Sequence, residues 1–196
     1  MSRAVFLDRD GVINKLVYNP NTSEYESPHF IDNFEFQDEA MYCLKTLQSY
    51  DYKLFLVSNQ PSYAKGKTTL ENIKSIHEKM LETLRSEKIA FEDYYYCYHH
   101  PDGVIQEYTK VCDCRKPSPY FILTALERYQ LDKVESWFIG DQDSDILCGS
   151  QAGLQTILIL NDHSKKKRGQ SNPDHSVMNL QEAVKIVIEK TKGVNK

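Results

Sequence analysis

Short apolar runs alternate with longer amphipathic segments along this chain. Four runs have the length and composition of buried β-strands: residues 4–7, 53–57, 137–139 and 156–160. Between the second and third runs, apolar residues recur at helical spacing from Leu70 to Leu84, with lysine and glutamate on the opposite face. Strands that alternate with helices predict a mostly parallel sheet with helices on both faces.

A second helical pattern lies near the carboxyl end of the chain, where Asn179 is placed to cap the helix. Its apolar positions are Leu180, Ala183, Val184, Val187 and Ile188. Two segments interrupt the alternation: residues 15–33 are polar and loop-like, and residues 97–119 are rich in cysteine, histidine and proline. The pattern therefore predicts one doubly wound α/β domain over residues 1–196, with two elaborated loops.

Composition and charge restrict the class of protein. With 196 residues the chain can bury a substantial core without disulfides, and Cys43 and Cys148, which lie among apolar residues, are expected to be core thiols. The net charge of −4 disfavours nucleic acid as a partner. We expect the basic run at 165–168 to be a solvated loop, with a local anion contact as the alternative. Charged residues interrupt the first apolar run, so we expect neither a signal peptide nor a membrane span, and a cytoplasmic protein.

Two aspartates stand at the end of the first apolar run. Asp8 and Asp10 follow Ala4–Leu7 and precede Gly11, which lets the backbone turn away. Alternate residues of an extended strand point the same way, so both carboxylates can face one pocket at the carboxyl end of the sheet. Two like charges this close favour a divalent cation or a shared proton. Taken alone, the same residues could form a solvated acidic turn.

Three further groups of polar residues lie at predicted strand ends or at the start of a helix. Ser58 and Asn59 follow the second strand, and the acidic segment 141–145 follows the third. Lys116 precedes a helix for which Pro117 is the predicted first residue. Singly, each group could be a helix cap, an exposed lysine or an acidic turn. Together with the paired aspartates they favour phosphoryl transfer, because a carboxylate can attack phosphorus while cations neutralise the anionic group.

Each residue has a predicted role in this chemistry. Asp8 would attack phosphorus, and Asp10 would act first as general acid and then as general base. Ser58 and Lys116 would hydrogen-bond the oxygens of the transferring phosphoryl group. Mg²⁺ prefers carboxylate oxygens, and its predicted ligands are Asp8, Asp10 and Asp141, with Asp145 as a further or alternate ligand.

These residues resemble the four motifs of the haloacid-dehalogenase (HAD) superfamily of phosphohydrolases. The motifs are an Asp-x-Asp pair, a serine or threonine, a lysine and a Gly-Asp-x-x-x-Asp segment. The residues of this chain that resemble them are, in the same order, Asp8 with Asp10, Ser58, Lys116 and residues 140–145. The resemblance covers about residues 4–160. It implies a HAD-like fold without a separate cap domain and an Mg²⁺-dependent phosphatase. We expect substrate contacts from Arg9, Asn59, Gln60, Arg115 and Gln142.

Within the superfamily, the resemblance is to phosphatases of heptose bisphosphate and histidinol phosphate. Residues 6–14, 31–36, 58–60 and 97–117 carry it. The implied reaction is removal of the 7-phosphate from a heptose 1,7-bisphosphate by a monomer. The alternatives are histidinol phosphate as the substrate and a non-catalytic scaffold that keeps only the loop rich in cysteine and histidine. Pro61, Lys65 and Gln142 depart from the family pattern and bear on the substrate or its anomer.

Three cysteines and a histidine are clustered in the second loop. Cys97-x-His99 and Cys112-x-Cys114 supply three thiolates and an imidazole, which would fill a tetrahedral shell. They predict a structural Zn²⁺ site at residues 97–116, because no position stays open for catalysis. The family's zinc loop has the same ligands at the same spacing. The alternatives are that Cys97 lies on a buried strand and the others are incidental, or that His100 replaces His99.

Overall fold

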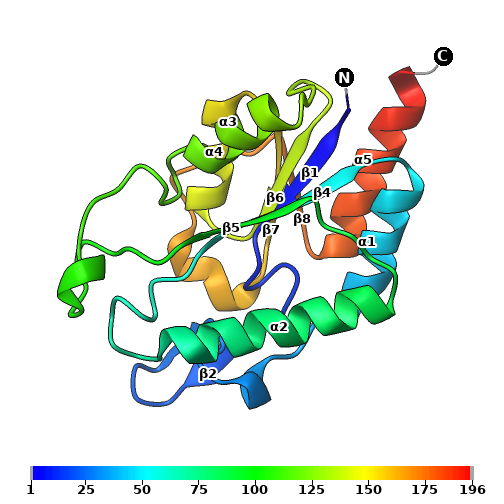
Figure 1. Ribbon diagram of the computed structural model, residues 1–196. Helices are drawn as coiled ribbons and strands as arrows, with labels where there is room; N and C mark the ends of the chain where they lie inside the picture. The colour runs from blue at the N-terminus through cyan, green and yellow to red at the C-terminus, as the bar shows by residue number, and fades with distance from the viewer. Residues whose placement is uncertain (1, 195–196) are drawn as a thin grey trace.

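Six parallel strands form the sheet at the centre of the molecule (Figure 1). The computed structural model describes residues 2–194. The strand order is β5-β4-β1-β6-β7-β8, so the order reverses beside β1 and the predicted doubly wound sheet is confirmed. The four predicted strands correspond to β1, β4, β6 and β7. The strands are β1 (Ala4–Leu7), β4 (Lys53–Asn59), β5 (Asp93–Cys97), β6 (Trp137–Gly140), β7 (Gln155–Ile159) and β8 (His175–Val177).

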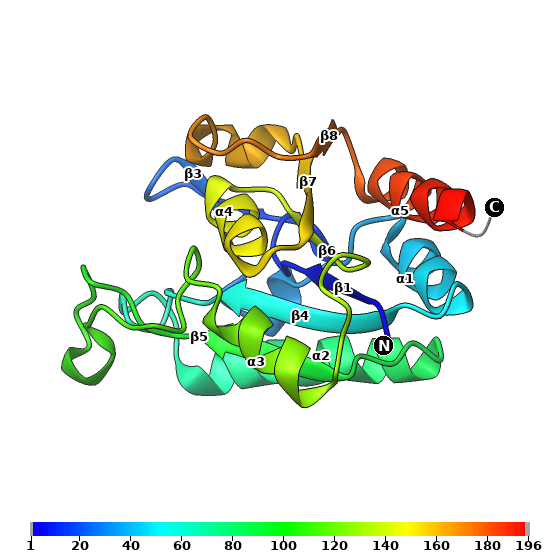
Figure 2. The same ribbon diagram turned by 90° about the horizontal axis from the view of Figure 1, so that it is seen from above.

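Side chains of the strands alternate between two hydrophobic cores. In β1, Val5 and Leu7 face one core, whereas Ala4 and Phe6 face the other. Residues of three helices complete the first core, and residues of two helices complete the second. Helices therefore cover both faces of the sheet, and α1 lies beside α5 in both views (Figure 1, Figure 2). The first group is α1 (Ala40–Ser49), α2 (Leu70–Ser86) and α5 (Leu180–Val194), and the second is α3 (Tyr120–Arg128) and α4 (Asp143–Ala152).

The segment predicted to be loop-like, residues 15–33, contains a β-hairpin, so that prediction is wrong. β2 (Val17–Asn19) pairs antiparallel with β3 (Glu24–Glu26). Tyr18 and Tyr25 face each other across the strands with ring centroids 5.4 Å apart. Strands of three residues are too short to show the alternation that identifies a strand in a sequence.

The helix after Lys116 begins later than predicted. Pro117 is its predicted first residue, but α3 begins at Tyr120. The intervening residues form a turn in which the Ser118 N–H donates to the Arg115 carbonyl oxygen at 2.9 Å. The chain therefore completes a turn before it can enter the helix. In the described part of the chain, 3₁₀ turns occupy three connections: η1 (Ile31–Asn33), η2 (Gln106–Tyr108) and η3 (Asp162–Lys167).

Two smaller sequence predictions are confirmed. Asn179 caps α5, since its side-chain oxygen accepts a hydrogen bond from the Glu182 N–H at 2.9 Å. Cys43 and Cys148 are both buried in the hydrophobic cores.

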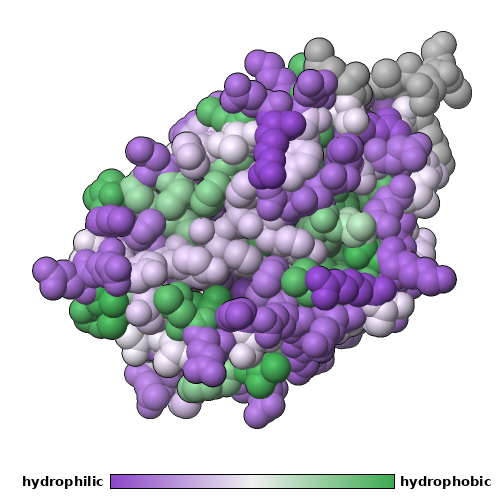
Figure 3. Space-filling model, in the orientation of Figure 1, coloured by the Kyte–Doolittle hydropathy of each residue, from purple (hydrophilic) through white to green (hydrophobic). Residues whose placement is uncertain are grey.

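The face of the molecule drawn in Figure 3 carries mostly hydrophilic residues. On this face, hydrophobic residues form separate patches between polar ones. Among residues 2–194, no helix combines the length and the apolar character that crossing a membrane requires.

Candidate active site

The polar motifs meet where the central strands end. Asp8 directly follows β1, Ser58 lies near the end of β4, and Asp141 directly follows β6. The carboxyl ends of parallel strands lie at one edge of the sheet, where open α/β folds bind ligands. Gly11 makes the turn after the first motif with a φ of +93°, and a Cβ there would lie 2.3 Å from the Asp141 carboxylate. Only glycine fits at this position.

Three carboxylates and one ammonium form a buried cluster at this edge. Asp8, Asp141 and Asp145 each offer an oxygen within 4.8 Å of the others. Lys116 Nζ lies 2.8 Å from Asp8 Oδ1 and 2.8 Å from Asp145 Oδ1, and it donates to the Val57 carbonyl oxygen at 2.7 Å. The predicted nucleophile Asp8, itself a predicted metal ligand, thus lies together with the predicted lysine and two further predicted metal ligands.

Burial and mutual repulsion shape the charges of this cluster. Burial raises the pKa of Asp8 to about 6, with Asp145 and Asp10 adding to the rise and Lys116 opposing it. Burial, followed by the charges of Asp145 and Asp8, raises the pKa of Asp141 well above its ordinary range. Both carboxylate oxygens of Asp141 are buried without a hydrogen-bond partner among the described residues. A hard divalent cation such as Mg²⁺ fits this donor set, because it would pair these oxygens and offset the repulsion.

Asp145 is already partly engaged within the protein. Its Oδ2 accepts hydrogen bonds from the N–H groups of Asp141 at 3.1 Å and Gln142 at 3.0 Å, and its Oδ1 pairs with Lys116. The residue therefore fixes the loop that carries Asp141. Compared with Asp145, which lies in α4, Asp141 has both carboxylate oxygens free for a metal.

The Asp10 carboxylate lies outside the three-carboxylate cluster, although Asp10 lines the same pocket. It accepts hydrogen bonds from Arg9 at 3.1–3.2 Å, from Asn14 at 3.0 Å and from Gln60 at 2.6 Å. Arg9 and Gln60 are predicted substrate contacts, but they are 0% and 1% exposed and bond to each other and to Asp10. In this structure both side chains form hydrogen bonds with other residues of the protein.

The site opens into a cavity of about 410 Å³ that is lined by several cations. Three of the predicted contacts, Asn59, Arg115 and Gln142, line it. The side-chain amide of Asn59 also forms two hydrogen bonds with the backbone of Lys116. It donates to the Lys116 carbonyl oxygen and accepts from the Lys116 N–H, both at 3.1 Å. The cationic side chains in the lining are Lys65, Lys67, Arg115, Lys116 and Lys167.

Two parts of this cavity are absent from the predicted set of site residues, although a local anion contact was the alternative for the basic run at 165–168. Lys167 belongs to the run predicted to be a solvated loop; it is exposed, as expected, but it also lines the cavity. The hairpin contributes Glu24, Tyr25 and Glu26 to the lining. The Tyr25 ring stacks on His163 of η3 with centroids 3.7 Å apart, so the hairpin and η3 form one wall. A contact between residues this distant along the chain leaves no signal in a single sequence.

The Cys/His group in the second loop has the geometry of a tetrahedral metal site. The Sγ atoms of Cys97, Cys112 and Cys114 lie 3.3–3.6 Å apart, and His99 Nδ1 lies 3.4 Å from Cys114 Sγ and 3.9 Å from Cys97 Sγ. A tetrahedron with Zn–S bonds of about 2.3 Å has edges of about 3.8 Å, so the four atoms can hold one metal ion. The four atoms belong to the predicted residues.

The geometry also bears on the alternatives for this loop. Cys97 does end the buried strand β5, and His99, Cys112 and Cys114 lie around it rather than elsewhere. His100 is outside the cluster; its Nδ1 accepts from the Asp102 N–H at 3.0 Å, and its side chain lines the active-site cavity.

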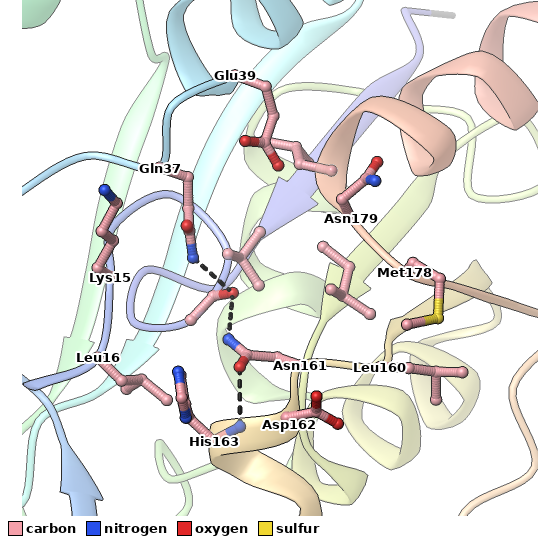
Figure 4. A pocket seen from close by; sticks show the side chains of 14 residues that line it. Lys15, Leu16, Gln37, Glu39, Leu160, Asn161, Asp162, His163, Met178 and Asn179 are labelled. Atoms are coloured by element: carbon pink, nitrogen blue, oxygen red, sulfur yellow. Dashed lines mark hydrogen bonds between the residues drawn. The ribbon is translucent and has the colours of Figure 1, made fainter. Parts of the chain in front are cut away.

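A second cavity, also of about 410 Å³, lies beside the turn at Gly11 (Figure 4). Its lining includes Gln37 and Asn161, whose side chains both donate to the Gly11 carbonyl oxygen, at 3.4 Å and 3.2 Å. Asn161 in turn accepts from the His163 N–H at 3.0 Å. These hydrogen bonds hold the turn that presents the two aspartates.

Comparison with known proteins gives consistent matches. A HAD-hydrolase-like family model matches residues 113–183. The D-glycero-beta-D-manno-heptose-1,7-bisphosphate 7-phosphatase of Escherichia coli strain K12 is 34% identical over 157 residues, 80% of this chain and 78% of that protein. The D-glycero-alpha-D-manno-heptose-1,7-bisphosphate 7-phosphatase of Photorhabdus laumondii is 34% identical over 158 residues, 81% of this chain and 82% of that protein.

A solved structure shares the fold. The D,D-heptose 1,7-bisphosphate phosphatase from B. bronchiseptica, complexed with magnesium and phosphate, has a TM-score of 0.78 at 23% identity and covers 96% of this chain and 99% of its own. With relatives 34% identical over 80% of its length, this chain belongs to the HAD-like hydrolases, in the family of the heptose-1,7-bisphosphate 7-phosphatases.

Proposed function

We propose that this protein is an Mg²⁺-dependent phosphatase that removes the 7-phosphate of a D-glycero-D-manno-heptose 1,7-bisphosphate. The observation that carries the proposal is the position of Lys116, which lies 2.8 Å from both Asp8 and Asp145 at the base of a cavity lined by cations. An attacking carboxylate is thereby held beside an ammonium that can bind a phosphoryl oxygen. Relatives named for this reaction support the choice of substrate.

Asp8 and Asp10 divide the chemistry between them. A carboxylate oxygen of Asp8 attacks phosphorus, the ester P–O bond breaks, and Asp10 gives a proton to the departing sugar oxygen. Asp10 then takes a proton from water as the water oxygen attacks the aspartyl-phosphate. The bond between phosphorus and Asp8 breaks, and inorganic phosphate is released.

The other motif residues stabilise charge during both steps. Ser58 and Lys116 hydrogen-bond the phosphoryl oxygens. Mg²⁺, held by Asp8 and Asp141 with Asp10 or Asp145 as a further ligand, would supply positive charge against the phosphoryl group and the attacking carboxylate.

We assign structural Zn²⁺ to the Cys/His group. Cys114 is directly followed by Arg115 and Lys116, so a metal ion that fixes its sulfur also fixes two cations of the cavity. Cys97 adds a second link, since its carbonyl oxygen accepts from the Gln60 N–H at 2.7 Å. The ion would hold the phosphate-binding residues in place and take no part in the chemistry.

The remaining cations suit the second phosphate of the substrate. Lys65, Arg115 and Lys167 line the same cavity as Asp8 and come from three separate segments of the chain. Arg115 can bind a phosphate in a bidentate manner, and a single lysine beside Asp8 is enough for the transferring group. A bisphosphate would therefore use both parts of the cavity, whereas a small monophosphate would use one.

Phosphate release from several substrates tests the proposal. We expect kcat/KM to be highest for one anomer of heptose 1,7-bisphosphate and much lower for histidinol phosphate and p-nitrophenyl phosphate, with D8N as the inactive control. Rapid acid quenching should trap a hydroxylamine-sensitive phosphoenzyme that D8N cannot form. A preference for histidinol phosphate would contradict the proposed substrate, and a wild-type enzyme that forms no phosphoenzyme would contradict the mechanism.

A further inference from the structure

Gln60 directly follows β4 and contacts two residues of the proposed reaction with one side chain. It is 1% exposed. Its Nε2 donates to Asp10 Oδ2 at 2.6 Å and to Ser58 Oγ at 2.9 Å, and its Oε1 accepts from Arg9 Nη2 at 2.9 Å. Both amide hydrogens and the amide oxygen are therefore engaged within the protein.

Arg9 determines which way this amide points. Arg9 is fully buried and grips the Asp10 carboxylate through Nε and Nη2 at 3.1–3.2 Å. A reversed Gln60 amide would place its oxygen against the Asp10 carboxylate and its NH₂ group against the Arg9 guanidinium. Both contacts would be repulsive, so only one orientation of the amide is stable.

The hydrogen bonds of Gln60 restrict the two groups that it touches. Asp10 is held at Oδ2 by Gln60 and at Oδ1 by Arg9 and by Asn14, while the residue still lines the cavity. Ser58 Oγ accepts from Gln60, so the hydroxyl proton of Ser58 must be donated in another direction. The Gln60 side chain thus fixes the position of the Asp10 carboxylate relative to the Ser58 hydroxyl.

We propose that Gln60 is a positioning residue for catalysis and not a contact for the sugar. Building on the proposed function, it aims the Asp10 carboxylate at the leaving oxygen and directs the Ser58 O–H toward the phosphoryl group. Its backbone is anchored as well, because the Gln60 N–H donates to the Cys97 carbonyl oxygen at 2.7 Å. The role follows from burial and from contacts that are all internal to the protein.

Two substitutions test this proposal, with p-nitrophenyl phosphate and heptose 1,7-bisphosphate as substrates. Gln60→Leu removes both donated hydrogen bonds, and we expect kcat to fall on the order of 10- to 100-fold on both substrates with KM little changed. Gln60→Glu places a carboxylate against Asp10, so its kcat should fall further than that of Gln60→Leu. Gln181→Glu, an exposed change of the same type on α5, is the matched control and should behave as wild type. Circular dichroism and thermal unfolding verify that each variant is folded.

A double-mutant cycle separates positioning from a general structural effect. If Gln60 acts through Ser58 and Asp10, Gln60→Leu should cost much less in the Ser58→Ala and Asp10→Asn backgrounds than in wild type. A full, additive loss in both backgrounds would overturn the proposal. So would a loss confined to KM for the bisphosphate, because that result would make Gln60 a sugar contact.

The outcomes also distinguish this proposal from the proposed function. A wild-type enzyme that hydrolyses p-nitrophenyl phosphate but not the bisphosphate would refute the substrate and leave the test of Gln60 intact. A protein inert on both substrates would refute the phosphatase function, and the role of Gln60 with it.

Discussion

Asp8 and Asp10 are separated by one residue, yet their carboxylates have different neighbours. Asp8 lies against Lys116 in the acidic cluster, whereas Asp10 is held by Arg9, Asn14 and Gln60. The difference suits two roles, because a nucleophile must reach phosphorus and a general acid/base must reach the leaving oxygen. Neighbours of this kind are visible only in three dimensions.

Single substitutions should separate these roles. We expect Asp8→Asn to abolish turnover, since an amide cannot attack phosphorus. Asp10→Asn should lower kcat by about 10²–10⁴-fold, the usual contribution of general acid/base catalysis. Steady-state phosphate release measures both effects. An Asp10→Asn enzyme with near-wild-type turnover would show that Asp10 does not have this role.

Arg115 should discriminate between substrates. Its guanidinium lines the cavity and donates to the His99 carbonyl oxygen at 3.2 Å, so it can contact a distant phosphate from a fixed position. We expect Arg115→Ala to lose about 1.5–3 kcal/mol more in transition-state binding for the heptose bisphosphate than for p-nitrophenyl phosphate. Comparison of kcat/KM for the two substrates tests this. Equal losses of kcat/KM on the two substrates would mean that Arg115 only supports the loop over residues 97–116.

At the scale of elements, the loop over residues 97–116, which holds the Cys/His group, joins three parts of the candidate active site. It carries Arg115 and Lys116, and it receives the Gln60 N–H at Cys97. We expect about one tightly held Zn²⁺ per chain, retained during dialysis against Mg²⁺ buffer. Stripping it should speed hydrogen exchange in residues 97–116 and lower activity, and Mg²⁺ alone should not restore it. Elemental analysis of active, freshly purified protein that finds no zinc would refute this assignment.

The hairpin is a second element whose attachment can be tested. Burial alone would raise the pKa of Glu26, but hydrogen bonds from Lys67, Thr22 and Asn19 outweigh it and hold that pKa at about 2. A lowered pKa means that Glu26 stabilises the fold above the ordinary pKa of 4.5, and that this stability is lost as the pH falls toward 2.

Glu26→Gln should therefore destabilise the protein in a pH-dependent way. We expect a loss of about 1–2 kcal/mol in the free energy of unfolding at pH 7, which shrinks as the pH is lowered below 4.5. Urea unfolding at a series of pH values measures this loss. Glu24→Gln on the same strand is the control, because the ion pair of the Glu24 carboxylate within residues 2–194 is an exposed one with Lys166 at 3.7 Å, and its loss should change little. A loss that is independent of pH would contradict the assignment.

At the scale of the whole molecule, periodicity predicted four of the six strands of the sheet together with α2 and α5, whereas β5, β8, α1 and α4 were not predicted. The motif residues follow strand ends, so a group of carboxylates at one edge of the sheet was predictable, but it holds Asp8, Asp141 and Asp145 while Asp10 lies outside it. The hairpin, the later start of α3 and the place of Lys167 depend on short strands and on contacts distant in sequence. The buried hydrogen bond between Arg9 and Gln60 depends on packing that a sequence pattern does not contain. One domain over residues 1–196, acting as a monomer, stays a prediction.

The acidic cluster also links metal binding to the stability of the whole protein. Burial raises the pKa of Asp8 from 3.8 to about 6, so between these values the native state without metal binds more protons than the unfolded state. Stability of the metal-free protein therefore falls as the pH rises through this window and stays lower above it. We expect Mg²⁺ to reverse the loss, since the three carboxylates that would hold it come together only in the folded state.

Asp8→Asn should thus stabilise the metal-free protein while it removes activity. In EDTA at pH 7.5, we expect its Tm to exceed that of wild type by roughly 3–6 °C, and the difference should shrink toward pH 4.5, where the Asp8 carboxyl is protonated. Adding Mg²⁺ should raise the Tm of wild type more than that of the variant. Asp113→Asn is the control, because Asp113 is exposed and lies in the loop over residues 97–116. Its Tm in EDTA should not exceed that of wild type. A lower Tm for Asp8→Asn at every pH would mean that the carboxylate, through Lys116, stabilises the fold and carries no electrostatic cost.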